Sequence, residues 1–318
     1  MDSTAGEEVV FQFLSVFRVF KSGRVERLVP ADTVPPSTDS RTGVQSKDVL
    51  IDPHTKLSVR IYLPKVSTSA EKLPLLIYIH GGAFTIGSVA SSIYHSHLIS
   101  LAAEANAVAV SVEYRLAPEN PLPAAYDDAW TAVEWVASHS NRDGAEMWLN
   151  EHADFDCVFI VGDSAGANIS YNVVGRASEN DNGPEGLNII GLGLVHPFFM
   201  IDKPDKLIEY IFPTSTGLED PRMNPWANPG LARFRCNRVL IIAAEHDFLN
   251  DRARGFHAAL RESGWKGSVE MVENEGEDHV FHLFNPDCEK AVALVKKVAS
   301  FIQSDSNEAE MVTRPSNL

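Results

Sequence analysis

Apolar positions follow two patterns that alternate along the chain. Short runs of uniformly apolar residues, such as 73–79 and 238–244, are typical of strands buried on both faces of a parallel sheet. Longer segments between them, such as 94–106 and 123–138, repeat apolar residues at helical spacing. Strands that alternate with helices predict an α/β fold, with a mostly parallel central sheet flanked by helices. The predicted strands cover residues 47–51, 57–63, 73–79, 107–112, 157–161, 188–195, 238–244 and 268–272, and the predicted helices cover residues 94–106, 123–138, 167–174, 251–263 and 287–302.

The two ends of the chain depart from this alternation. Residues 17–20 and 25–28 flank a short polar turn, and this arrangement predicts a β-hairpin. Residues 303–318 are polar, and we expect them to form a disordered tail. The 318 residues allow one α/β domain with an accessory lid or two smaller domains. There are no internal repeats, and we expect a single domain over residues 1–318.

Composition and charge narrow the class of protein. The formal net charge of −16 disfavours nucleic acid and anionic membranes as partners, because both would repel the chain. No apolar stretch is long enough to span a membrane, and the acidic N-terminus is unlike a secretory signal, so we expect a cytoplasmic protein. Three widely spaced cysteines indicate neither a disulfide framework nor a metal knuckle, and we expect no metal and no cofactor.

One short motif points to chemistry. The sequence Gly-Asp-Ser-Ala-Gly at 162–166 joins a buried apolar run to a helical pattern, and only a sharp turn can connect the two. Gly162 and Gly166 lack the β-carbons that would clash in such a turn. The turn would lift the Ser164 hydroxyl above the sheet edge, in the arrangement called a nucleophile elbow. Ser164 is therefore the candidate nucleophile.

A serine hydroxyl is a weak nucleophile, so it needs a base and a carboxylate that orients the base. In this type of fold both partners follow the serine, at the carboxyl ends of later strands. Asp247 is nearest to such a strand end and is favoured over Asp251, which suits the first turn of a helix. His279 follows an acidic turn and is favoured over His282, which begins an apolar segment.

Negative charge that builds on the substrate oxygen requires hydrogen-bond donors already in place. One candidate is the backbone N–H of Ala165, at the N-terminus of the helix that follows the serine. The others lie in the loop His80-Gly81-Gly82-Ala83, where missing side chains let the backbone approach the substrate closely. The alternative interpretation of this loop is an ordinary glycine turn.

Four motifs in a fixed order carry a family resemblance. They lie at residues 80–84, 113–128, 162–166 and 278–281. Together they resemble the plant carboxylesterases of class I, the 2-hydroxyisoflavanone dehydratase-like proteins of the hormone-sensitive-lipase-like group in the α/β-hydrolase superfamily. The resemblance extends from residue 17 to the last helix. It implies a small cap built from residues 1–22 and 198–230, a monomer or homodimer, a catalytic triad of Ser164, Asp247 and His279, and an oxyanion hole formed by Gly81, Gly82, Ala83 and Ala165.

The chain departs from the family pattern in two places. Ala83 stands where a third glycine is usual, a mild change if its φ is negative. The segment from 196 to 225 is shorter than is common, so we expect an open or reshaped pocket. That pocket would be lined by some of Phe84, Ile86, Phe198, Phe199, Met200, Tyr210, Phe212 and Trp226, for each of which core packing is the alternative interpretation.

Three functions fit the resemblance. The leading hypothesis is hydrolysis of a small carboxylic ester through an acyl-serine intermediate, in plant specialised metabolism or in the turnover of foreign esters. A second is a dehydratase or cyclase that uses His279 as a base on a plant metabolite. A third is a binding protein similar to the gibberellin receptors, which have lost the histidine that His279 would supply here. The sequence does not separate acyl from alcohol preference.

Overall fold

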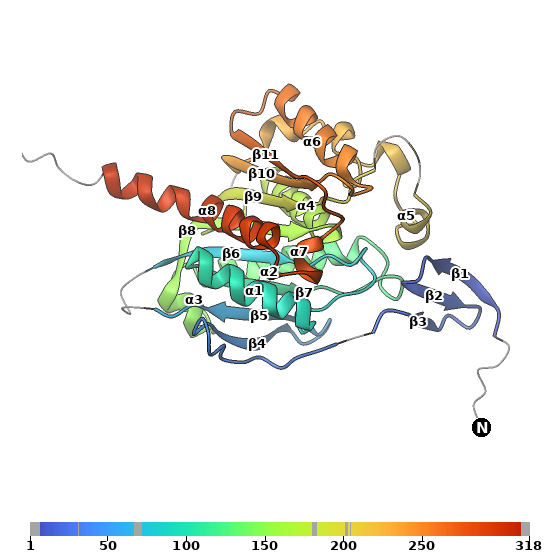
Figure 1. The fold of residues 1–318 in the computed structure, drawn as a ribbon, viewed down its shortest axis with the longest axis horizontal. Helices are drawn as coiled ribbons and strands as arrows, with labels where there is room; N and C mark the ends of the chain where they lie inside the picture. The colour runs from blue at the N-terminus through green and yellow to red at the C-terminus, as the bar shows by residue number, and fades with distance from the viewer. Residues whose placement is uncertain are drawn as a thin grey trace, which may run out of the picture.

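The computed structural model describes residues 7–30, 32–66, 72–179, 183–200, 203 and 205–312, with side chains as far as residue 303. Its centre is an eight-stranded sheet in the order β11-β10-β9-β8-β6-β7-β5-β4 (Figure 1). The six strands from β11 to β7 run parallel, whereas β5 pairs antiparallel with β7 and β4 pairs antiparallel with β5. The predicted α/β fold with a mostly parallel sheet is confirmed.

The strands of the central sheet are β4 (Gln45–Asp52), β5 (Leu57–Leu63), β6 (Leu73–Ile79), β7 (Val108–Glu113), β8 (Ala153–Asp163), β9 (Ile189–Val195), β10 (Arg238–Ala244) and β11 (Ser268–Asn274). The helices are α1 (Ser92–Ala105), α2 (Ala124–Ala137), α3 (Met147–His152), α4 (Ala165–Glu179), α5 (Lys206–Ile211), α6 (Asn250–Glu262), α7 (Phe281–Phe284) and α8 (Glu289–Val312). Each predicted strand and helix has a counterpart among these elements.

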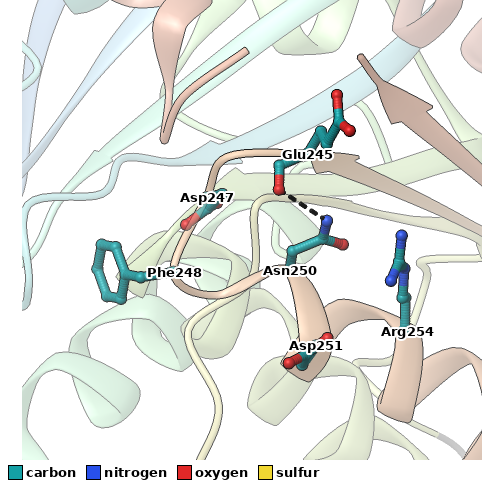
Figure 2. Close-up of a pocket in the computed structure, with 6 residues that line it drawn as sticks. All are labelled: Glu245, Asp247, Phe248, Asn250, Asp251 and Arg254. Atoms are coloured by element: carbon teal, nitrogen blue, oxygen red, sulfur yellow. Dashed lines mark hydrogen bonds between the residues drawn. The ribbon is translucent and has the colours of Figure 1, made fainter. Parts of the chain in front are cut away.

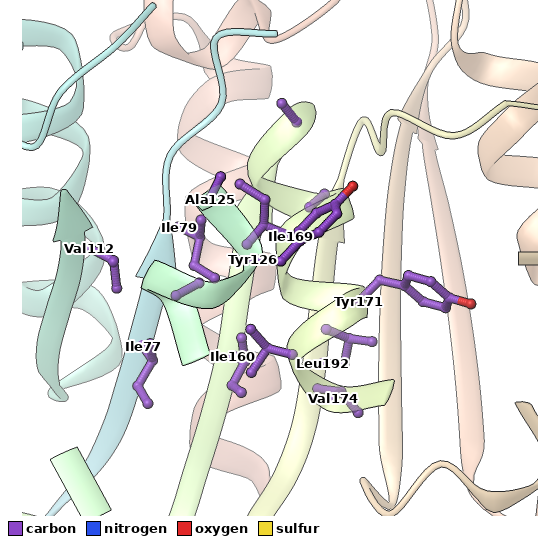
Figure 3. Packing of buried hydrophobic residues seen from close by; sticks show 14 of the residues in the cluster. Ile77, Ile79, Val112, Ala125, Tyr126, Ile160, Ile169, Tyr171, Val174 and Leu192 are labelled. Carbon is purple, nitrogen blue, oxygen red and sulfur yellow. The ribbon is translucent and has the colours of Figure 1, made fainter. Parts of the chain in front are cut away.

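The sheet separates two apolar clusters, because successive side chains of a strand point to opposite faces. In β6, Ile77 and Ile79 belong to the cluster under α2, α4 and α6, whereas Leu76 and Tyr78 belong to the cluster under α1 and α8. Figure 3 shows the first cluster, in which Ile169 of α4 packs among side chains of the sheet. Burial on both faces explains why these strands are uniformly apolar in sequence.

A separate three-stranded sheet precedes the central one. The predicted hairpin is present as β2 (Phe17–Phe20) and β3 (Val25–Arg27), and β1 (Val9–Phe13) adds a third antiparallel strand that the sequence did not indicate. Phe11 of β1 stacks on Tyr210 of α5, with ring centroids 3.8 Å apart. Arg27 of β3 donates a hydrogen bond to the carbonyl of Thr85 at 2.7 Å. The small sheet is thereby joined both to α5 and to the loop after β6.

Two further regions differ from expectation. Helix α8 continues in the backbone to Val312, so the tail predicted from residue 303 begins as helix, and residues 313–318 lie outside the described part of the chain. The irregular stretch between β9 and β10 contains α5 and three short 3₁₀ turns at Gly217–Glu219, Pro225–Ala227 and Leu231–Arg233.

No helix in the described ranges combines the length and the apolar character needed to cross a bilayer.

Candidate active site

Ser164 occupies the sharp turn that the sequence predicts. Strand β8 ends at Asp163, helix α4 begins at Ala165, and Ser164 between them has a φ of 51°, in the left-handed region. A β-carbon at Gly166 would lie 2.0 Å from the carbonyl oxygen of Ile79, and one at Gly162 would lie 2.5 Å from the backbone of Gly166. Both glycines are therefore required for the close passage of strand, turn and helix.

The structure brings the three predicted catalytic side chains together. The Ser164 Oγ lies 2.9 Å from His279 Nε2, and His279 Nδ1 lies 2.8 Å from Asp247 Oδ2. Asp247 follows β10 and His279 follows β11, so both come from carboxyl ends of strands, as does Ser164 from β8. Asp247 is buried, whereas His279 is partly exposed.

A tight turn holds the Asp247 carboxylate. Its Oδ1 accepts a hydrogen bond from the backbone N–H of Leu249 at 2.8 Å, and its carbonyl oxygen accepts one from Asn250. Figure 2 shows this turn beside a surface hollow of about 380 Å³. The second candidate, Asp251, sits in the first turn of α6, exposed to solvent, as the alternative interpretation expects.

The loop after β6 has an unusual backbone. Gly82, Ala83 and Phe84 all have positive φ, at 109°, 53° and 63°. A β-carbon at Gly82 would lie 2.1 Å from the Ile86 carbonyl oxygen, so only glycine fits there. The mild effect expected for Ala83 assumed a negative φ, and that assumption is wrong. Ala83 instead adopts a left-handed conformation that costs an L-residue about 1–2 kcal/mol.

Not every proposed oxyanion donor is available. The N–H of Gly81 points to the buried carboxylate of Asp163 at 3.1 Å and to the Tyr94 hydroxyl oxygen at 3.0 Å. Within the described part of the chain, no group accepts a hydrogen bond from the N–H of Gly82, Ala83 or Ala165. The inclusion of Gly81 among the donors is therefore corrected, and its role is to let the chain pass close to Asp163 and Ser164.

Asp163 ties the loop to the elbow. Its carboxylate also accepts hydrogen bonds from Tyr78 at 2.8 Å and Tyr94 at 2.9 Å. Burial raises the pKa of Asp163, and the hydroxyl donors oppose that rise because they stabilise the charged form. The residue that precedes the serine therefore organises the segment that faces it.

His196 lies beside the triad and was not predicted. It follows β9, has a φ of 49°, and its Nδ1 accepts a hydrogen bond from the backbone N–H of Val280 at 2.8 Å. Burial lowers its pKa to about 3, helped by the positive charge that His279 can carry. Since His196 stands directly after a predicted strand, the rule that assigns functional residues to carboxyl strand ends could have found it.

Further buried histidines lie behind His196. The rings of His196, His282 and His97 follow one another with centroids 5.8 and 5.1 Å apart. Burial holds the pKa of His282 well below its usual value and lowers that of His97 to about 4. Neither ring nitrogen of His282 has a partner among the described residues. His282 is therefore a packed residue, which agrees with its place at the start of an apolar segment.

One group of side chains has the spacing of a metal site. Ligand atoms of His196, Asp247 and His279 lie within 4.8 Å of one another, a closeness not foreseen from the sequence. The Nδ1 atoms of both histidines are already engaged, one with Val280 and one with Asp247. These three side chains are therefore already engaged with one another and with the backbone through hydrogen bonds.

Most of the predicted pocket residues are packed in the core. The five buried ones, which contribute to the cluster under α2 and α4, are Phe84, Phe198, Phe199, Met200 and Phe212. Trp226 packs against Gly255 of α6, and Tyr210 stacks on Phe11. Ile86 is half-buried next to Gly82. The pocket assignment is therefore corrected for the five core residues alone, whose side chains serve packing. Trp226 and Tyr210 are 39% and 36% exposed, and a pocket role for them and for Ile86 stays a prediction.

Comparison with known proteins agrees with this geometry. Residues 76–283 match a family model described as the alpha/beta hydrolase fold. The chain belongs to the α/β-hydrolase family. A solved relative with the same fold is an esterase from the hyperthermophilic archaeon Pyrobaculum calidifontis, which is 28% identical at a TM-score of 0.66 and covers 82% of this chain and 86% of that one.

Within the α/β-hydrolases, the chain is similar to curated plant proteins over nearly its full length. Probable carboxylesterase 2 of Arabidopsis thaliana is 42% identical over 318 residues, which cover 95% of this chain and 98% of that protein. The 2-hydroxyisoflavanone dehydratase of Glycyrrhiza echinata is 39% identical over 94% of this chain and 98% of that protein. The resemblance inferred from the four motifs is thus confirmed.

Proposed function

We propose that this protein is a serine carboxylesterase that hydrolyses small carboxylic esters through an acyl-serine intermediate. The observation that carries the proposal is the continuous series of hydrogen bonds from Ser164 through His279 to Asp247. The similarity to plant carboxylesterases supports the same reaction class.

In the first half of the reaction, Ser164 Oγ attacks the carbonyl carbon while His279 Nε2 takes the hydroxyl proton. The buried Asp247 carboxylate holds the imidazole and stabilises its positive charge. The tetrahedral intermediate then collapses, the bond to the alcohol oxygen breaks, and His279 returns the proton to the leaving alcohol. A water molecule then attacks the acyl-serine while His279 takes its proton. The bond to Ser164 breaks, His279 returns the proton to the serine oxygen, and the carboxylic acid is released.

The substrate oxygen that gains negative charge needs nearby donors. The N–H groups of Gly82, Ala83 and Ala165 suit this role, because no described group accepts a hydrogen bond from them. Ala165 also stands at the N-terminus of α4, where the helix dipole favours a negative charge.

The proposed small cap consists of residues 1–22, which include β1 and β2, together with the segment at 198–230. The Phe11–Tyr210 stack supports this assignment, since it joins the two parts of the cap to each other. The Arg27–Thr85 hydrogen bond joins the neighbouring strand β3 to the loop that carries the oxyanion donors. Residues 1–6, 201, 202 and 204 of the predicted cap lie outside the described part of the chain.

The test compares ester hydrolysis in a variant at Ser164 and in a control variant. Ser164→Ala should lower the hydrolysis of a short-chain ester about a thousandfold or more, because no acyl-serine can form. Ser170→Ala is the matched control, since it removes a buried hydroxyl from the same helix, and it should leave the rate nearly unchanged. Undiminished hydrolysis by Ser164→Ala would contradict the proposal.

Elimination is the second candidate function, because a relative of similar identity is a dehydratase. His279 would act as the base and the oxyanion donors would polarise a carbonyl group, with no acyl-enzyme. A 2-hydroxyisoflavanone is the substrate for this assay. Appreciable dehydration that survives Ser164→Ala but not His279→Ala would favour elimination over hydrolysis.

A receptor-like role without catalysis is disfavoured by the hydrogen bond between His279 and Ser164. Cleavage of p-nitrophenyl acetate that disappears in His279→Ala would exclude it. We place the protein in the cytoplasm and in plant specialised metabolism, as a monomer or homodimer with no cofactor. Imaging of a fluorescent fusion and sedimentation of the purified protein test location and assembly.

A further inference from the structure

Phe248 is an exposed aromatic residue at the catalytic histidine. Its side chain directly follows Asp247, is 72% exposed, and places its ring centroid 5.4 Å from that of His279. The two rings are tilted by 49°, and the exposure of the Phe248 ring leaves it accessible to another molecule. An aromatic ring exposed to this degree loses the hydrophobic stabilisation that burial would give.

The backbone around Phe248 keeps the ring outside the core. Asp247 accepts hydrogen bonds from Leu249 and Asn250, so the turn is fastened on both sides of Phe248. Asn250 also donates to the Glu245 carbonyl oxygen at 3.3 Å. Figure 2 shows the Phe248 ring directed away from the charged groups of Asp251 and Arg254. The turn thus presents the apolar Phe248 ring at the surface beside His279.

The reaction geometry determines which part of a substrate meets this ring. His279 Nε2 takes the proton from Ser164 and returns it to the leaving alcohol oxygen, so that oxygen lies next to the imidazole. The carbonyl oxygen lies on the other side, toward Gly82 and Ala83. The group bonded to the leaving oxygen is therefore the part of the ester that extends past His279.

We infer that Phe248 forms the binding site for the alcohol portion of the ester, and that it selects esters of aromatic or other apolar alcohols. This inference rests on the proposed function. A benzyl or phenolic group would stack on the Phe248 ring and bury its exposed face, whereas a short alkyl or hydroxylated alcohol would leave it in water. The preference concerns the alcohol and leaves the acyl group unconstrained.

The test compares two esters with the same acyl group, benzyl acetate and ethyl acetate. Because both form the same acetyl-enzyme, the ratio of their kcat/KM values reports on the alcohol alone. Phe248→Ala should lower kcat/KM for benzyl acetate about tenfold, while kcat/KM for ethyl acetate stays nearly constant. Phe248→Tyr keeps the ring and should preserve the ratio. The preference for p-nitrophenyl acetate over the butyrate should not change.

Phe284→Ala is the matched control, since Phe284 is also 72% exposed but lies in α7. It should leave the benzyl-to-ethyl ratio unchanged. Equal losses for both esters in Phe248→Ala would overturn the inference, because they would mean that Phe248 only supports His279. The inference would also be overturned if Phe284→Ala lowered the benzyl-to-ethyl ratio as much as Phe248→Ala does. A wild-type protein that cleaves neither ester would overturn the proposed function itself.

Discussion

The Nδ1 atom of His196 lies 2.8 Å from the backbone nitrogen of Val280, the residue that follows His279. A neutral imidazole that accepts at Nδ1 carries its proton at Nε2. Because burial lowers the pKa of His196 to about 3, the ring stays neutral and keeps accepting this hydrogen bond at neutral pH. His196 therefore positions the backbone next to His279, the proposed catalytic base.

Replacement of His196 separates this positioning role from simple packing. His196→Leu should reduce kcat of ester hydrolysis about tenfold to a hundredfold with little change in KM, since the imidazole is displaced while the substrate still binds. His196→Asn should recover much of the rate, because its side-chain oxygen can accept from Val280 at nearly the same place. A further readout is the NMR signal of the proton between His279 and Asp247. Equal rates for both variants would contradict the role.

The buried histidines make stability depend on pH. His97, His196 and His282 all have lowered pKa values in the folded protein, whereas in the unfolded chain each titrates near 6.5. Below that value the unfolded chain binds protons that the folded one does not. Their stabilising contribution is therefore complete above about pH 6.5 and is lost as the pH falls toward 4 and 3. Between pH 6 and pH 5 the slope should approach that of one proton taken up on unfolding for each histidine.

Urea unfolding at several pH values measures this slope. His282→Phe should flatten it by about one proton, with the ring volume roughly kept. His54→Leu is the control and should leave the slope unchanged, because His54 is exposed to water in the folded chain as well. A slope that His282→Phe does not alter would show that His282 takes up no proton on unfolding.

In the loop after β6, Ala83→Gly should preserve stability and activity, whereas Gly82→Ala should impair activity. Ala83→Gly removes a left-handed L-residue, so the free energy of unfolding should stay equal or rise by up to about 1 kcal/mol. Gly82→Ala forces a β-carbon to 2.1 Å from the Ile86 carbonyl oxygen and should lower kcat about a hundredfold by displacing the donors. Thermal unfolding and initial rates check both variants. Similar rates for the two would contradict the assigned loop geometry.

Much of the fold and the triad could be predicted because the sequence signals were local. Gly162 and Gly166 indicate a sharp turn, because a β-carbon at either position would clash with the backbone. Asp247 and His279 were predicted because each follows the carboxyl end of a strand. The engagement of the Gly81 N–H with Asp163 could not be predicted, since it joins the loop after β6 to the end of β8, 82 residues further along the chain. The contact of His196 with Val280 also depends on how distant segments meet.

The pocket was predicted poorly for a related reason. Composition does not tell an aromatic side chain that faces a substrate from one that packs in the core, and Phe199 lies in the core between Tyr171 and Phe256. Phe248 was overlooked because it stands next to a catalytic residue outside any apolar pattern. Its exposure beside His279 became visible only in three dimensions.

The central claim is that His279, held by Asp247, makes the Ser164 hydroxyl reactive. Its most direct test is incubation with a fluorophosphonate, followed by mass spectrometry of the peptide that contains Ser164. Wild-type protein should carry one stoichiometric adduct at Ser164, and His279→Ala should label far more slowly. A folded wild-type protein that leaves Ser164 unmodified, under conditions that fully label a control esterase, would contradict the claim.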